Sequence, residues 1–77
     1  MTENVLSQAR DWGFVCHWES NGTWQILPQQ NNQRWKLQSE GDRWLLIVNN
    51  VPQISFPPHE VIAFLELRRP SAKRGKS

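Results

Sequence analysis

Between residues 14 and 56, large apolar side chains recur at every second position, in five short runs. Successive side chains of a β-strand point to opposite faces of a sheet, so this alternation predicts half-buried strands. Turn-forming residues such as Asn21-Gly22 and Gly41-Asp42 separate the runs. The pattern therefore predicts an antiparallel meander whose five strands span about residues 14–19, 23–28, 33–39, 43–48 and 52–56.

Helical periodicity is found on both sides of this region. Thr2 can cap a first helix over about residues 2–12, whose apolar residues fall on one side. A second helix is predicted over about residues 58–69, because Pro58 suits a first helical turn and Pro70 ends the pattern.

Together these elements predict one α+β domain over residues 1–69. A five-stranded antiparallel β-meander would be flanked by an N-terminal and a C-terminal α-helix. A chain of 77 residues is near the lower limit for folding by burial alone, and Cys16 is its only cysteine, so no intramolecular disulfide can help. Residues 70–77 are small, polar and basic, which is typical of a disordered tail.

The first turn also predicts how its two strands align. A three-residue loop from Ser20 to Gly22 would pair Trp18 with Trp24. A two-residue Asn21-Gly22 turn would instead put the two indoles on opposite faces. We expect the three-residue loop, because it keeps the apolar residues together.

The lengths of the next two turns add further apolar residues to the same face of the sheet. A two-residue turn between the third and fourth strands pairs Leu37 with Leu46. A four-residue loop between the second and third strands brings Ile26 opposite Trp35. One face of the sheet would then collect the alternating apolar residues, which are Phe14, Cys16, Trp18, Trp24, Ile26, Trp35, Leu37, Trp44, Leu46, Val48, Ile54 and Phe56.

Five residues of the chain are tryptophan, and four of them fall on this apolar face. Exposed aromatic side chains can stack on bases, so the face could instead be a nucleic-acid platform. A platform needs cations beside it, however, and Arg34, Lys36 and Arg43 alternate with the tryptophans and so point away. Both helices also need an apolar surface to cover. We therefore predict a core, shielded from water, that contains Trp18, Trp24, Trp35 and Trp44.

The opposite sheet face is the candidate binding surface. Leu45 and Ile47 should form a small apolar centre among cationic and polar side chains, which is typical of a modest protein interface. Two alternatives are a solvated face without a partner and a helix that crosses over to cover Leu45 and Ile47. The candidate residues are Arg34, Lys36, Arg43, Leu45, Ile47, His17 and Gln25.

Charge is divided unevenly along the chain. Residues 1–67 hold four Lys or Arg against seven Asp or Glu, whereas residues 68–77 hold five basic residues and no acidic one. Such a tail is either a solubilising terminus or a segment that attracts phosphates, acidic proteins or anionic membrane surfaces. The candidate phosphate-contacting residues are Arg68, Arg69, Lys73, Arg74 and Lys76.

The sequence indicates no catalytic, cofactor or metal site. Cys16 and His17 are strand neighbours that point to opposite faces, so they do not form a catalytic pair. Neither His17 nor His59 has partners at metal-ligand spacing, and no glycine-rich phosphate loop is present. We predict a protein that is not an enzyme, uses no cofactor and has no evident small-molecule substrate. The chain lacks an apolar run long enough for a signal peptide or a membrane span, so the expected location is the cytoplasm.

Two resemblances concern the whole chain. Its helix–sheet–helix order resembles double-stranded-RNA-binding domains in outline, but those begin their second helix with lysines, whereas this one begins Pro57-Pro58-His59-Glu60. No binding residue is therefore carried over. The short Gln-, Asn- and Trp-rich chain is also similar in composition to small cyanobacterial proteins, and that resemblance implies no activity.

The sequence thus predicts a non-enzymatic binding or adaptor module that acts through a protein partner or a second copy of itself. The alternative is weak, salt-sensitive binding of RNA or single-stranded DNA by the basic tail and by Arg34, Lys36 and Arg43, which should lie close together on one face across the third and fourth strands.

Overall fold

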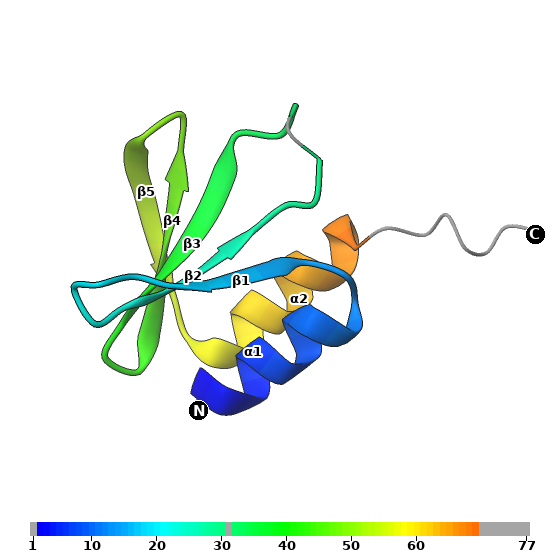
Figure 1. Ribbon diagram of the computed structural model, residues 1–77, viewed down its shortest axis with the longest axis horizontal. Helices are drawn as coiled ribbons and strands as arrows, with labels where there is room; N and C mark the ends of the chain where they lie inside the picture. The colour runs from blue at the N-terminus through cyan, green and yellow to red at the C-terminus, as the bar shows by residue number, and fades with distance from the viewer. Residues whose placement is uncertain (1, 31, 70–77) are drawn as a thin grey trace, which may run out of the picture.

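Five strands form one antiparallel sheet in the order β1-β2-β3-β4-β5, with one helix before it and one after it (Figure 1). The computed structural model describes residues 2–30 and 32–69, so the tail predicted over 70–77 lies outside the described residues. The predicted α+β meander with its two flanking helices is confirmed. The elements are α1 Thr2–Asp11, β1 Val15–Trp18, β2 Trp24–Leu27, β3 Trp35–Glu40, β4 Arg43–Val48, β5 Val51–Phe56 and α2 Pro58–Arg68.

Both helices pack on the same face of the sheet and contact each other there (Figure 1). Val61 and Leu65 of α2 are fully buried in one hydrophobic cluster. The other members of this cluster come from α1 and from the sheet side of the core, and they are Val5, Leu6, Ala9, Phe14, Ile26, Trp35, Leu37 and Trp44. The molecule thus has two layers with one core between them.

The first hairpin has the predicted three-residue loop. Trp18 lies opposite Trp24, and the backbone N–H of Glu19 donates a hydrogen bond to the Thr23 carbonyl at 2.8 Å. Gly22 has φ +90°, a backbone conformation that favours glycine because glycine has no Cβ.

The alignment of the next strands agrees with the prediction at one hairpin and differs at the other. Leu37 lies opposite Leu46, as expected. Ile26, however, lies opposite Leu37 rather than Trp35, so the predicted alignment of β2 with β3 is wrong. The shift is two residues, and therefore each side chain stays on its predicted face. Pro28 has no N–H to donate, and pairing between these two strands stops at Ile26.

Ser39 joins β2 to β3 along their short paired stretch. It is buried, and its Oγ accepts a hydrogen bond from the backbone N–H of Trp24 at 2.8 Å. Ser39→Ala would leave this N–H without a partner, which we expect to lower the free energy of unfolding by about 1–3 kcal/mol in urea denaturation. Ser55→Ala is the control, because its hydroxyl serves an exposed hydrogen bond, and it should cost under about 0.5 kcal/mol. Equal losses in the two variants would contradict this role of Ser39.

The tryptophans do not all enter the core. Trp44 and Trp35 are buried and Trp24 is half-buried, but Trp18 is 53 % exposed, so the prediction that Trp18 is shielded is wrong. Trp18 stands on an edge strand, where it has a sheet neighbour on one side only. Its ring packs edge-on against Trp24, with the ring centroids 5.1 Å apart. Ile54, on the other edge strand, is also 53 % exposed.

Candidate functional site

The sheet face opposite the helices, called the back face below, is ordered into three rows that cross the strands. The middle row contains His17, Gln25, Gln38, Leu45 and Ser55. The row nearer to the β2–β3 loop contains Val15, Leu27, Lys36, Ile47 and Pro52. The row nearer to the β1–β2 and β3–β4 turns contains Glu19, Thr23, Glu40 and Arg43. Six of the seven candidate residues therefore share this face, and Arg34 borders it just before β3.

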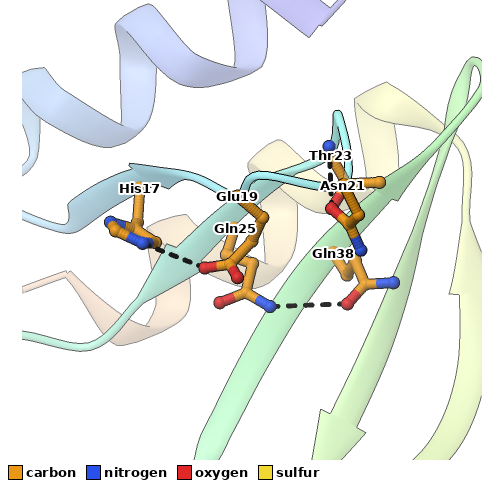
Figure 2. A network of polar contacts seen from close by, with 6 residues as sticks. All are labelled: His17, Glu19, Asn21, Thr23, Gln25 and Gln38. Atoms are coloured by element: carbon orange, nitrogen blue, oxygen red, sulfur yellow. Dashed lines mark hydrogen bonds and ion pairs between the residues drawn. The ribbon is translucent and has the colours of Figure 1, made fainter.

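Polar side chains at the β1–β2 side of the back face are held by one another. The Nε2 atom of His17 lies 3.0 Å from Oε2 of Glu19 (Figure 2). On the neighbouring strands, the amide of Gln25 donates a hydrogen bond to Oε1 of Gln38 at 3.4 Å. These imidazole and amide groups are already oriented, so a partner that meets them would lose little of its binding energy in ordering them.

The apolar centre of the back face is open to solvent. Val15 is 45 % exposed, and Leu45 and Ile47 are half-buried by their neighbours in the sheet. Both helices lie on the other side, so the alternative in which a helix covers Leu45 and Ile47 is wrong. The back face therefore combines a partly exposed apolar centre with a polar surround.

The three cations of the candidate site do not lie close together. Lys36 is opposite Ile47, whereas Arg43 is opposite Glu40, four positions further along β3. At about 3.3 Å per strand residue this separates Lys36 and Arg43 by roughly 13 Å along the sheet. Arg34 and Lys36 are thus at one end of the back face, and Arg43 is at the other.

Arg43 is also engaged within the fold. Its Nε donates to Oγ of Ser55 at 2.8 Å, and its Nη2 donates to the Ser55 carbonyl at 3.0 Å. The carboxylates of Glu19 and Glu40 belong to the same end of the back face. The predicted cationic cluster is therefore replaced by a face with one basic end and one end of mixed charge.

An open groove of about 410 Å³ continues the back face where β2 and β3 separate. It has apolar residues of β1 and β2 on one side and the cations Arg34 and Lys36 on the other. Amide side chains make up most of the remaining lining, and none of the described lining residues is acidic. The lining consists of Val15, Leu27, Pro28, Gln29, Gln30, Gln33, Arg34, Trp35, Lys36 and Asn50.

The tail candidates fall into two groups. The guanidinium of Arg68 lies 3.8 Å from the centre of the Phe64 ring, and that of Arg69 lies 4.9 Å from the Trp12 ring. The other three candidates, Lys73, Arg74 and Lys76, lie outside the described residues. Among residues 4–30 and 32–69, whose side chains the structure describes, no Lys or Arg side chain forms an ion pair with Asp or Glu.

A second hollow was not predicted from the sequence. It lies on the helix side of the sheet and is lined by residues of β3, β4 and α2, including Phe64 and Arg68. The only sequence signal for it is the arginine that follows an aromatic residue by one helical turn, because such residues lie on the same side of a helix.

Cys16 lies under α1, where its Sγ is 3.8 Å from the carbonyl oxygen of Leu6. Burial raises the pKa of the Cys16 thiol above its ordinary value, although the charge of Arg10 acts in the opposite direction. The thiol is therefore protonated near neutral pH, where a thiolate would be the reactive species. Because the folded-state pKa is the higher one, the stability gained from the neutral thiol is lost as the pH rises through it.

Comparison with protein-family models, curated proteins and solved structures finds no match. Among the side chains that the structure describes, those of residues 4–30 and 32–69, no group of three or more His, Cys, Asp or Glu is placed to hold a metal ion. No helix in the described part of the chain is long and apolar enough to cross a membrane.

Proposed function

We propose that the protein is a non-enzymatic binding module that docks another protein chain on its back face. One observation carries this proposal: both helices lie on one side of the sheet, and Leu45 and Ile47 remain partly exposed in the middle of the other side. Protein interfaces of modest size combine such an apolar centre with a polar rim. Here Lys36, Gln25 and His17 supply that rim.

Charge on the back face favours a second copy of the chain as the partner. Arg34 and Lys36 lie at one end of β3, and Glu40 lies at the other end, as does Glu19 of the first hairpin. A two-fold axis through the middle of the face would bring the basic end of each copy against the carboxylates of the other. Arg43 is a cation at the acidic end and would repel the basic end of the other copy. Its guanidinium is held by hydrogen bonds to Ser55 of β5, which reduces this repulsion.

Edge-to-edge pairing of the outer strands is a less favourable way for the chain to form a dimer. Pro52 of β5 has no N–H to donate, and the pairing of β5 with β4 is irregular at Gln53. Both features weaken a sheet edge as a template for another strand. The other edge, β1, is only four residues long.

Ile47→Glu places a charge at the apolar centre of the proposed interface. We expect it to weaken self-association at least tenfold, which corresponds to about 1.4 kcal/mol. Ile54→Glu is the matched control, because Ile54 is on β5 but on the other face and is 53 % exposed. Sedimentation velocity over a range of concentrations measures both effects, and unfolding midpoints verify that both variants fold.

The same two variants also show whether the back face binds a second copy of the chain or a different protein. If the chain sediments as a monomer throughout, a partner captured by the wild type and the control but not by Ile47→Glu would still support the back face. Association or capture that is equal for Ile47→Glu and Ile54→Glu would contradict the proposal.

A second candidate function, nucleic-acid binding, is favoured by the unpaired cations. Arg34, Lys36 and Arg68 lie around adjoining hollows, and no described Asp or Glu pairs with them. The tail with Lys73, Arg74 and Lys76 follows Arg69 in sequence. Charge of this kind attracts phosphates without reading a sequence.

A titration with labelled RNA and single-stranded DNA at low and moderate salt tests this candidate. We expect weak binding that falls steeply with salt and is mostly lost when Lys73, Arg74 and Lys76 are changed to glutamine. Changing Arg34 and Lys36 to glutamine instead should have the smaller effect. Tight binding that survives moderate salt and the loss of the tail charges would place nucleic acid above a protein partner.

A further inference from the structure

The hollow on the helix side of the sheet has a volume of about 320 Å³. It lies between the start of β3, the end of β4 and the last turn of α2, on the opposite side of the sheet from the back face. Its lining consists of Gln33, Arg34, Trp35, Leu46, Val48, Phe64 and Arg68.

Four apolar side chains form the floor of this hollow. Trp35 lies edge-on against Phe64, with ring centroids 5.1 Å apart and ring planes at 84°. Trp35 also lies opposite Val48 on the neighbouring strand β4, so both α2 and β4 hold its ring in place. Leu46, Val48 and Phe64 are only half-buried. An apolar group placed in the hollow would therefore cover apolar surface that the fold leaves partly in water.

Hydrogen-bond donors border the same hollow. The guanidinium of Arg68 is stacked on the Phe64 ring at 3.8 Å, and its Nη1 donates to the Phe64 carbonyl at 3.4 Å, which leaves its other N–H groups for a ligand. Oε1 of Gln33 accepts a hydrogen bond from Nε1 of Trp35 at 2.9 Å, so the Gln33 amide nitrogen remains a donor. Arg34 forms no ion pair with any described Asp or Glu, and none of the described lining residues is acidic.

We propose that this hollow binds a small apolar molecule that carries one carboxylate. A guanidinium matches a carboxylate with two parallel hydrogen bonds, and Arg34 and Arg68 supply two such groups beside the apolar floor. The volume is near the lower end of the range for small-molecule pockets, about 300–1,000 Å³. A single aryl or medium-chain acyl acid fits that description, and a bare phosphate does not because it would leave the floor uncovered.

Octanoate is the probe, with octanol and octylamine as matched molecules that have the same chain without the carboxylate. Titrated into the full chain, octanoate should shift the indole N–H resonance of Trp35 in NMR spectra and leave that of exposed Trp18 in place. Octanol and octylamine should bind at least tenfold more weakly. The octanol hydroxyl is neutral and cannot form the two parallel hydrogen bonds of an arginine–carboxylate pair, and protonated octylamine is a cation that accepts no hydrogen bond.

Arg68→Gln is a better test of the site than a change of Arg34, because Arg34 lines both the hollow and the back-face groove, whereas Arg68 lines the hollow and not that groove. Arg68 is exposed, so the variant should fold normally, and its octanoate affinity should fall about tenfold. Arg69→Gln is the control, because Arg69 stacks on Trp12 instead, and its affinity should be unchanged. Octanol binding equal to octanoate binding, equal effects of the two substitutions, or no octanoate-induced shift of Trp35 would each overturn the proposal.

Discussion

Trp44→Ala is expected to unfold a large share of the molecules at room temperature. The Trp44 side chain is 1 % exposed and belongs to the only buried cluster among the described residues. Removal of a buried aromatic side chain costs about 3–5 kcal/mol. Domains are stable by about 5–15 kcal/mol, and so short a chain is expected near the low end of that range.

Trp18→Ala is the matched control for this prediction. Trp18 is 53 % exposed, so its removal should cost only about 1 kcal/mol, mostly through the lost contact with Trp24. Urea unfolding followed by circular dichroism measures both variants without relying on tryptophan fluorescence. If Trp18→Ala lowered the free energy of unfolding as much as Trp44→Ala, Trp18 would be part of the core, which would contradict its exposed position at the end of the first hairpin.

Val61→Asp should be nearly as destabilising, for an electrostatic reason. Val61 is 0 % exposed and packs in α2 against the cluster that holds both helices to the sheet. An aspartate there would place an unpaired charge in the core, which costs about 3–5 kcal/mol. The expected result is a chain that is largely unfolded at neutral pH, or in which α2 is detached from the sheet.

Ala63→Asp introduces the same charge two residues away on the exposed side of α2. It should change the free energy of unfolding by less than about 0.5 kcal/mol. Thermal unfolding of the two variants at the same pH gives the comparison. Similar melting temperatures would mean that α2 does not cover the sheet in solution, and the back face would no longer be the only uncovered one.

The strands and most of their register were predictable because the signals are local. A side-chain period of two fixes which residues share a face, and Gly22 and the Gly41-Asp42 turn fix the loop lengths. The β2–β3 loop carries no comparable signal, because Gln29, Gln30 and their neighbours suit many loop geometries. That is where the predicted register was wrong by two residues.

The exposure of each residue was less predictable, because it depends on which part of the sheet the two helices and the neighbouring strands cover. Trp18 and Ile54 have the same alternation as the buried residues, yet both stand on edge strands. Alternation also placed Lys36 and Arg43 on one face, and the correctly predicted pairing of Leu37 with Leu46 already implied that they lie far apart on it. The hollow that Phe64 and Arg68 share with β3 and β4 is a tertiary feature, and the spacing of these two residues on α2 does not by itself predict it.

The most direct test of the proposed interface is an isotope-filtered NOE experiment on a mixture of labelled and unlabelled full-length chains. The account predicts intermolecular NOEs to the methyl groups of Leu45 and Ile47, and no NOEs from these methyl groups to α1 or α2 of the same chain. Intermolecular NOEs confined to Trp18, Val51 or Ile54, or intramolecular NOEs from Ile47 to either helix, would contradict it.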